Sequence, residues 1–170
     1  MRLVRLFALC AAALLPTGCA SYHLGPVNGA AAGDQTIEIV PFNNQTLQPR
    51  LGDAVTQALR EQLQTDGTYR LATRGPGDIV VTGVITQYQR NGVSYLPGNV
   101  LTAENYRVVV TAHVIARERD TGRLLLDKNI HGDVLVHVGT DLADAERQAA
   151  PLLAEDLARN VTELLTEGSW

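Results

Sequence analysis

The stretch of sequence that decides the fold is YRVVVTAHVIARER, residues 106–119. Every second side chain from Tyr106 to Ala116 is apolar or aromatic, whereas the positions between them mix Arg, Thr and His with Val and Ile. Because successive side chains of a β-strand point to opposite faces, this pattern predicts a strand with one buried face and one mixed face. The chain therefore contains a sheet that is covered on one side.

Three further segments have the character of strands. Residues 36–42 alternate around two isoleucines, residues 79–90 are rich in β-branched side chains, and residues 124–138 repeat apolar side chains on one face. The triplet Asp120-Thr121-Gly122 is predicted to form the hairpin turn before the last strand, because glycine adopts the positive φ that such turns need. Residues 91–105 contain two glycines and a proline, and we expect them to form a long loop.

Two amphipathic helices are also predicted. Apolar side chains fall at helical spacing across residues 51–63, an Asp-Gly pair ends that segment, and a brief extended piece follows at 69–72. Residues 141–165 have a similar pattern, with Asp141 as the N-cap. Pro151 lies inside this second segment and removes a helical hydrogen bond, so we expect either a kink or two abutting helices.

The order of the predicted elements is strand, helix, three strands and helix, which indicates a single α+β domain over residues 36–170. The most economical packing buries the apolar face of the sheet under both helices. The expected fold is therefore a two-layer sandwich, in which a mixed sheet of about four strands carries two helices packed on one face.

The first residues have the layout of a secretory signal peptide. Two arginines precede the apolar run from Leu6 to Leu15, which as a helix would span about 15 Å, half of the roughly 30 Å hydrocarbon core of a bilayer. A stable transmembrane helix is thus the poorer interpretation. We expect residues 1–18 to be removed as a lipoprotein signal peptide, together with Cys10.

Thr17-Gly18-Cys19 resembles the end of a bacterial lipobox, although Pro16 stands where leucine is usual. The resemblance implies that the Cys19 thiol is lipidated and that Cys19 becomes the new N-terminus. Acyl chains then anchor the protein without a transmembrane helix, because each buried CH₂ contributes about 0.8 kcal/mol. The alternative is an ordinary signal peptide that leaves Cys19 as a free thiol.

Residues 19–35 are rich in small and polar side chains and are expected to form the tether between the lipid anchor and the domain. Ala20 follows Cys19, whereas lipoproteins retained in the inner membrane typically carry Asp at that position. The expected location is the outer membrane, with the lipid anchor on its periplasmic side.

Composition excludes several functional classes. The chain has 170 residues, of which 45% are hydrophobic and 19% are charged, and these values are typical of a folded domain. Its two cysteines cannot build a disulfide framework. A formal net charge of −4 argues against nucleic acid as a partner, because binding to its phosphates requires a basic surface.

No segment carries a strong catalytic signature. Asp120-Thr121-Gly122 copies the Asp-Thr-Gly of aspartic proteases, but its flanking arginines and its hairpin position favour an ordinary turn. His113, His131 and His137 are predicted on the mixed face of adjacent strands, where two of them could approach a metal ion. Asp133 lies on the same face, but no carboxylate or thiol at helical or loop spacing completes a site, so surface histidines are the preferred interpretation. We therefore predict a non-enzymatic protein with no cofactor and no metal site.

Several features, taken together, indicate one family. They are the lipobox with Cys19-Ala20-Ser21-Tyr22-His23-Leu24, the strand end Pro41-Phe42-Asn43-Asn44-Gln45-Thr46, a helix from Leu51, and the strand Glu104-Asn105-Tyr106-Arg107-Val108-Val109-Val110. This combination resembles the LptE family of lipopolysaccharide-assembly lipoproteins. The terminal helix also matches in place and length, so the resemblance covers nearly all of the mature chain.

The resemblance implies a non-catalytic role. Members of the LptE family sit inside the lumen of LptD, a large outer-membrane β-barrel, where they plug it, help it assemble and contact lipopolysaccharide on its way to the cell surface. The family's lipid contacts lie on basic residues near strand ends, which makes Arg90 and Arg107 the nearest candidates in this chain. Arginine suits such a contact, because its guanidinium group forms bidentate hydrogen bonds with phosphate.

Two other functions are kept as alternatives. One is a periplasmic adaptor or activator lipoprotein that serves another envelope machine, such as a cell-wall synthase or a secretion channel. The other is an envelope hydrolase with a site that no motif reveals. An adaptor needs a long reach from the membrane, whereas a tether of about sixteen residues extends only about 5–6 Å × √n on average. The short tether favours the barrel plug.

Overall fold

The computed structural model describes residues 33–96, 98–138 and 141–167. The predicted signal peptide, Cys19 and nearly all of the tether lie outside these described residues. Within them, neither helix combines the length and the apolar character that crossing a bilayer requires.

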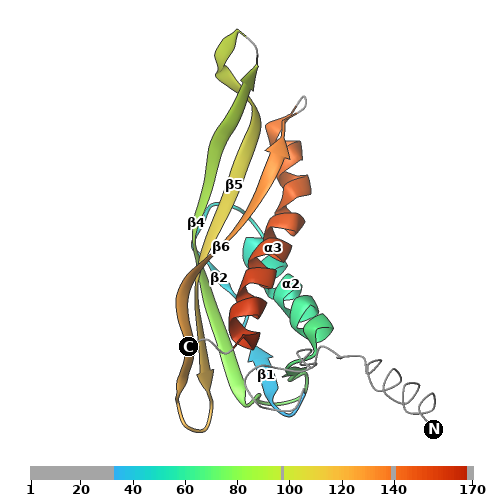
Figure 1. Ribbon diagram of the computed structural model, residues 1–170, viewed down its shortest axis with the longest axis vertical. Coiled ribbons are helices and arrows are strands. Elements are labelled where there is room, and N and C mark those ends of the chain that lie inside the picture. Colours follow the sequence, from blue (N-terminus) through green and yellow to red (C-terminus); the bar gives the residue numbers. More distant parts are fainter. Residues whose placement is uncertain (1–32, 97, 139–140, 168–170) are drawn as a thin grey trace, which may run out of the picture.

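The described chain forms a two-layer α+β domain, in which both helices lie on the same side of one sheet (Figure 1). Helix α2 packs on α3, and α3 packs on β6. In chain order the elements are β1 (Thr36–Ile39), β2 (Asn43–Asn44), α2 (Leu51–Asp66), β3 (Arg70–Leu71), β4 (Ile79–Leu96), β5 (Asn99–Glu118), β6 (Leu124–His137) and α3 (Leu142–Thr166).

The sheet is mixed and has six strands, in the order β3-β1-β4-β5-β6, with β2 paired to β4 off this path. β1 runs parallel to β3 and β4, whereas β4, β5 and β6 are antiparallel neighbours. The predicted two-layer α+β class is confirmed, but the expected count of about four strands is too low. The additional strands β2 and β3 have two residues each, which is too short to produce an alternating pattern in the sequence.

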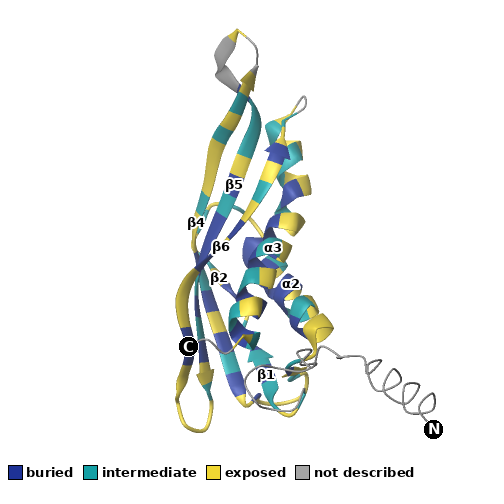
Figure 2. Ribbon diagram, in the orientation of Figure 1, coloured by how far each residue is buried: buried dark blue, intermediate teal, exposed yellow. Residues whose placement is uncertain are grey.

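The alternating pattern predicted for β5 is confirmed, and the buried face of this strand forms the centre of the core. Five helix-facing side chains in the middle of β5 are no more than 1% exposed, and Figure 2 shows the buried residues of the sheet and the helices. The core side chains of β5 are Val108, Val110, Ala112, Val114 and Ala116.

The prediction of a long loop at residues 91–105 is wrong, because β4 continues to Leu96 and β5 begins at Asn99, so the described residues of this segment extend the hairpin. Asn91 pairs with Arg107 and Gly92 with Tyr106, and Gly98 turns the chain at a φ of 79°. None of the described side chains in this hairpin end joins the main hydrophobic cluster. Without a face to bury, these strands carry no apolar periodicity, and their glycines and proline resemble a loop.

Helix α2 begins and ends near the predicted residues. Arg50 precedes it in the left-handed region at a φ of 61°. At the other end Gly67 adopts a φ of 76°, and its N–H donates to the Leu63 carbonyl oxygen at 3.1 Å. Glycine adopts this conformation without steric cost, which is why helices so often end on it.

Helix α3 is one helix of 25 residues that continues through Pro151, so the alternative of two abutting helices is wrong. The predicted N-cap is confirmed, since Asp141 Oδ1 accepts a hydrogen bond from Ala143 N at 2.8 Å. Ala149 and Leu153, on either side of the proline, are both buried. Burial of the helix on both sides of Pro151 offsets the hydrogen bond that proline cannot donate.

The contact between α3 and β6 is closer than ordinary side-chain packing allows. A Cβ atom placed on Gly132 of β6 would lie 2.6 Å from the backbone N of Leu157. Such a distance is well inside van der Waals contact, so only glycine permits α3 to approach the strand this closely.

Gly132→Ala is therefore expected to destabilise the domain by about 1–3 kcal/mol, because the added methyl group forces α3 away from β6. Urea unfolding followed by far-UV circular dichroism measures the change. Asn129→Ala, an exposed site on the same strand, serves as the control and is expected to change stability by less than about 0.5 kcal/mol. Equal stability of Gly132→Ala and the wild type would contradict the close contact.

Candidate interaction surfaces

The two arginines predicted to contact lipopolysaccharide lie near each other in the ladder but on opposite faces of the sheet. Arg90 of β4 pairs with Val108, and the next pair along the ladder joins Asn91 with Arg107. The Arg90 side chain reaches α3 on the helix side, whereas the Arg107 side chain lies on the helix-free face beside Asp133. The structure therefore does not bring the two guanidinium groups together.

A β-bulge explains this arrangement. The register of β4 against β5 shifts between Ile85 and Gln87, so that one extra residue enters β4. Before the bulge the odd-numbered residues of β4 face the helices, and after it the even-numbered residues do, as the half-buried Tyr88 shows. Because a bulge reverses the face of every later side chain, Arg90 turns toward α3.

Arg90 lines a polar pocket of about 450 Å³ between β4, the loop at residues 45–48 and α3. Its guanidinium Nη1 lies 3.1 Å from Glu146 Oε1, and half of the arginine side chain remains exposed. Burial raises the pKa of the neighbouring Tyr88 phenol, and the Glu146 carboxylate raises it further. Tyr88 therefore stays a neutral hydrogen-bonding group in this pocket at physiological pH.

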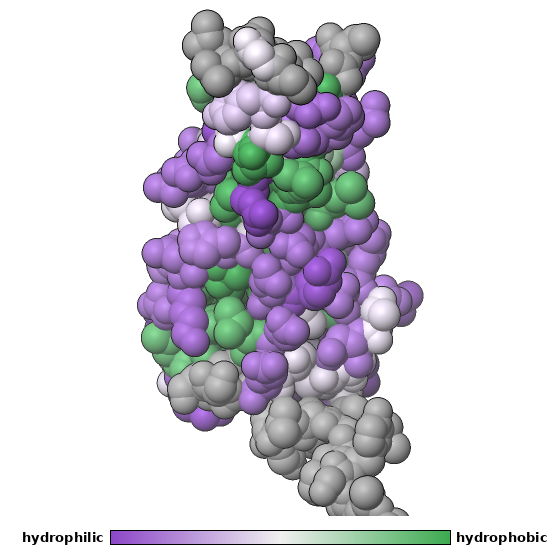
Figure 3. Space-filling model, turned by 45° about the horizontal axis from the view of Figure 1, so that its top comes forward, coloured by the Kyte–Doolittle hydropathy of each residue, from purple (hydrophilic) through white to green (hydrophobic). Residues whose placement is uncertain are grey.

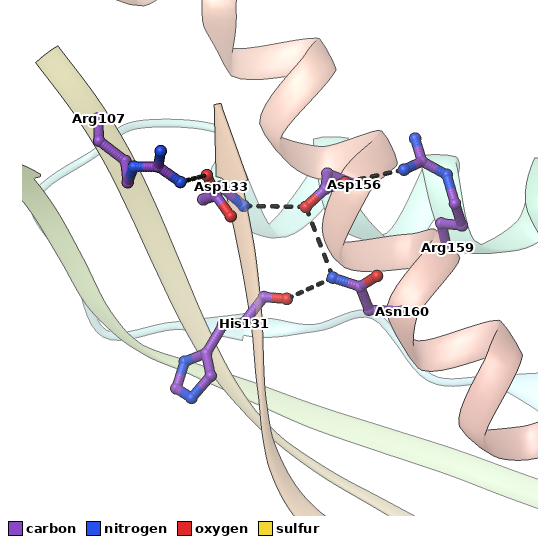
Figure 4. A network of polar contacts seen from close by, with 6 residues as sticks. All are labelled: Arg107, His131, Asp133, Asp156, Arg159 and Asn160. Atoms are coloured by element: carbon purple, nitrogen blue, oxygen red, sulfur yellow. Dashed lines mark hydrogen bonds and ion pairs between the residues drawn. The ribbon is translucent and has the colours of Figure 1, made fainter. Parts of the chain in front are cut away.

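Arg107 begins a polar network that joins the helix-free face to α3 (Figure 4). Its Nη1 lies 2.8 Å from Asp133 Oδ2, and the Asp133 backbone N–H donates to Asp156 Oδ2 at 3.0 Å. Asp156 also accepts hydrogen bonds from Arg159 at 2.9 Å and from Asn160 at 3.5 Å. Arg107 and Asp133 are both about half exposed, so this ion pair remains open to solvent and to ligands.

The three histidines are held by three different partners. His113 lies 2.7 Å from Asp127, His131 lies 3.0 Å from Thr111, and His137 lies 2.9 Å from Asn105. Within the described ranges, no cluster of three or more His, Cys, Asp or Glu side chains is arranged to hold a metal ion.

Asp120-Thr121-Gly122 forms the turn between β5 and β6, as the sequence predicts. Gly122 has a φ of 69°, and its N–H donates to the Glu118 carbonyl oxygen at 3.0 Å. The Glu118 carboxylate accepts hydrogen bonds from Arg123 and from the Thr121 hydroxyl, the latter at 2.6 Å. These two donors, Arg123 first, lower the pKa of Glu118 from 4.5 to about 2.

The loop between β2 and α2 presents an apolar side chain that sequence analysis missed. Asn44 organises the loop, because its Oδ1 accepts from the Thr46 N–H at 3.0 Å and from the Thr46 hydroxyl at 2.8 Å. Asn44 Nδ2 also donates to the Gln48 carbonyl oxygen at 2.7 Å. Leu47 stands at the tip and is fully exposed. Asn44 and Thr46 belong to the sequence motif at the end of the first strand. Only their hydrogen bonds in the structure show that this motif holds Leu47 at the tip of the loop.

Phe42 fixes the base of this loop between the two layers. Its backbone N–H donates to the buried Thr56 hydroxyl of α2 at 2.9 Å. A Cβ atom on Gly83 of β4 would lie 2.2 Å from the Phe42 ring, so the ring occupies the space that a side chain would fill. The Pro-Phe-Asn-Asn-Gln-Thr motif therefore builds a rigid loop.

Hydrophobic surface also gathers below the grey atoms at the upper end of the molecule, with hydrophilic surface around it (Figure 3). At that end a groove of about 470 Å³ runs between the last residues of β6 and the first turns of α3. Leu135 and Leu152 contribute to its lining, and they are 60% and 53% exposed.

These features define a class of protein: a two-layer α+β domain with a helix-free sheet face, a displayed loop and an edge groove. Three solved structures share the fold. A hypothetical protein from Chlamydia trachomatis is 11% identical with a TM-score of 0.56, covering 82% of this chain and 99% of its own. A protein from Xanthomonas campestris is 9% identical with a TM-score of 0.56, covering 78% of this chain and 85% of its own. A protein from Caulobacter crescentus, described as a lipoprotein, is 11% identical with a TM-score of 0.50, and the match covers 76% of this chain and 91% of that protein.

The family is established by sequence. The profile of the LptE family, described as lipopolysaccharide-assembly, matches residues 35–165, from just before β1 to the last turn of α3. The chain belongs to the LptE family, a family of non-enzymatic lipoproteins. Comparison with curated proteins finds no significant match.

The Glu118 carboxylate gives the turn a pH-dependent contribution to stability. Because the folded-state pKa is depressed, the contribution is fully present above about pH 4.5 and is lost as the pH falls toward 2. We expect Glu118→Gln to lower the melting temperature at pH 7 and the difference from the wild type to shrink between pH 4.5 and 2. A difference in melting temperature that stays constant down to pH 2 would contradict the depressed pKa of Glu118.

Proposed function

We propose that this protein is an outer-membrane lipoprotein that plugs the LptD β-barrel, helps it assemble and contacts lipopolysaccharide during delivery to the cell surface. Cys19 supplies the lipid anchor on the periplasmic side. The observation that carries the proposal is the match of the LptE family profile across the whole α+β domain.

The helix-free face of the sheet supports a location inside a barrel. The lumen of a large outer-membrane barrel is polar and hydrated, so a plug needs a polar surface over its own core. The helix-free face carries hydroxyl, amide, imidazole and charged groups among partly buried valine and isoleucine side chains. Its exposed members include Thr82, Gln87, Gln89, Arg107, Arg117, Asn129 and Asp133.

The displayed loop supports a contact with the barrel wall. Leu47 is held at the tip by the hydrogen bonds of Asn44, so little conformational entropy is lost when a partner covers it. A rigid apolar side chain in a polar surrounding is typical of the residues that dominate binding energy in an interface.

The two arginines support contact with the phosphates of lipopolysaccharide. Arg90 and Arg107 each pair with a carboxylate, but both side chains are about half exposed. In the Arg107–Asp133 pair both side chains are exposed, and such pairs contribute only about 0–1 kcal/mol, so a phosphate group with better geometry displaces Asp133 at small cost. Glu146 is only 12% exposed, so Arg90 would contact a phosphate through its exposed half while it keeps its carboxylate partner. Because the two guanidinium groups lie on opposite faces, each would contact a different part of the ligand or a different ligand.

Co-purification tests the proposal against the adaptor alternative. A tagged chain in detergent-solubilised outer membranes is expected to emerge in a stoichiometric complex with the LptD barrel. Repeated isolation of the chain alone, or with a cell-wall synthase or secretion channel in place of the barrel, would overturn the proposal.

Leu47→Ser is expected to weaken binding to the barrel about ten- to a hundredfold, because burial of a leucine side chain contributes about 1.5–3 kcal/mol. Leu124→Ser is the matched control, since Leu124 is also an exposed leucine but lies at the turn between β5 and β6. Pull-down with a titrated, immobilised barrel measures both affinities. Equal binding by the two variants would show that the loop is not a barrel contact.

Arg107→Ala is expected to weaken binding of lipopolysaccharide about tenfold, because a charge-assisted hydrogen bond contributes about 1.5–3 kcal/mol, offset by the weak ion pair already present. Arg117→Ala, an exposed arginine on the same face of β5, is the control. Fluorescence titration with phosphorylated and dephosphorylated lipid A separates the phosphate contribution. If Arg107→Ala loses no more affinity for lipid A than Arg117→Ala, Arg107 is not a lipopolysaccharide contact. The affinity of Arg90→Ala is compared with that of Arg117→Ala in the same way.

A further inference from the structure

β6 is the long free edge of the sheet, because the opposite edge is the two-residue strand β3. Val138 N donates to the Glu104 carbonyl oxygen at 2.9 Å, and the ladder pairs His137 with Asn105. In this antiparallel register the even-numbered residues of β6 direct both N–H and C=O toward β5. The odd-numbered residues therefore direct both groups away from the sheet.

Helix α3 satisfies these outward groups only in the middle of β6. The Asp133 N–H donates to Asp156 at 3.0 Å, and the His131 carbonyl oxygen accepts from Asn160 Nδ2 at 2.7 Å (Figure 4). Within the described part of the chain, the structure shows no hydrogen bond to the outward N–H of Leu135 or of His137. Natural proteins normally cover or blunt such an edge, so an open stretch is a potential pairing surface.

The open stretch lies directly beside the groove between β6 and α3. Residues 134–137 form one wall of the groove, and Ala145, Ala149 and Leu152 of α3 contribute to the other. A strand added to β6 would direct one set of side chains into this groove and the alternate set toward the helix-free face of the sheet. The site therefore offers main-chain hydrogen bonds and apolar contacts in the spacing that an extended segment requires.

The rim of the groove is acidic and selects the occupant. Asp141 and Asp144 line it, and neither lysine nor arginine does. Arg147, which pairs with Asp144, is 71% exposed. A second copy of this chain would add a second acidic rim, whereas a basic extended segment complements the one present.

We propose that the edge of β6 at residues 134–137 accepts one added β-strand from the barrel partner, supplied by an extended segment with alternating apolar side chains and a lysine or arginine. The identity of the partner rests on the proposed function. The mode of binding rests on the unpaired edge, the groove and its acidic rim.

Hydrogen–deuterium exchange of the purified full-length chain, alone and in complex with the barrel, tests the added strand. We expect the amides of Leu135 and His137 to exchange rapidly in the free chain and at least tenfold more slowly in the complex. The amide of Asp133, already bonded to Asp156, is expected to be slow in both states. Unchanged exchange at Leu135 and His137 in an intact complex would overturn the inference and leave the proposed function standing.

Leu135→Pro removes the outward N–H without breaking a hydrogen bond to β5, so the strand is expected to keep its pairing. This variant is expected to dissociate from the barrel at least tenfold faster than Leu135→Ala, which retains the N–H. Asn129→Pro, at an outward position of the same edge but outside the groove, is the matched control. Equal dissociation by Leu135→Pro and Leu135→Ala would contradict strand addition.

Three other results of the exchange and binding experiments would each overturn the strand proposal. Protection of Leu135 and His137 in the free chain that increases with protein concentration would assign the edge to a second copy and overturn the inference. Protection by lipid A vesicles without the barrel would assign the groove to an acyl chain and also overturn it. Absence of any complex between the wild type and the barrel would refute the proposed function, and the strand proposal with it.

Discussion

The structure depends on one close contact, the approach of α3 to β6 at Gly132. The sheet has a continuous apolar face on β5, and the two helices are the only described elements that cover it. Leu157 reaches the strand because glycine leaves its backbone open there. The same approach places Asp156 and Asn160 against the edge of β6, so the contact that buries the core also seals the middle of that edge. Where α3 no longer covers the edge, the groove begins.

The elements that contribute to the core are predictable from the sequence, because burial imposes a period on their side chains. The alternation of β5, the stripe of α2 and the Asp141 cap all appear where the pattern indicates them. The hairpin end at 91–105 is missed, since its pairing comes from main-chain hydrogen bonds beyond the core and needs no apolar pattern. β2 is missed for a related reason, because two residues cannot show a period. β3 lies within the extended piece predicted at 69–72, but its two residues give no pattern that marks them as a strand of the sheet.

The candidate sites are harder to predict than the fold because they depend on geometry that composition does not encode. A single bulge after Ile85 places Arg90 and Arg107 on opposite faces, although both arginines flank the same segment, residues 91–105, in the sequence. Asn44 resembles an ordinary turn residue, yet its three hydrogen bonds display Leu47 at the loop tip. The edge groove has no signature in the sequence, because its walls come from β6 and α3, which lie side by side only in the folded chain. Surfaces of this kind suit a protein that acts by binding, consistent with membership of a non-enzymatic family.

The central claim, that the chain serves lipopolysaccharide delivery through a barrel partner, is tested most directly by depletion in cells. The measurement is the amount of lipopolysaccharide at the cell surface, compared with the levels of unrelated outer-membrane proteins in the same cells. The account predicts that surface lipopolysaccharide falls while those proteins remain in place. Normal surface lipopolysaccharide after complete depletion would contradict it.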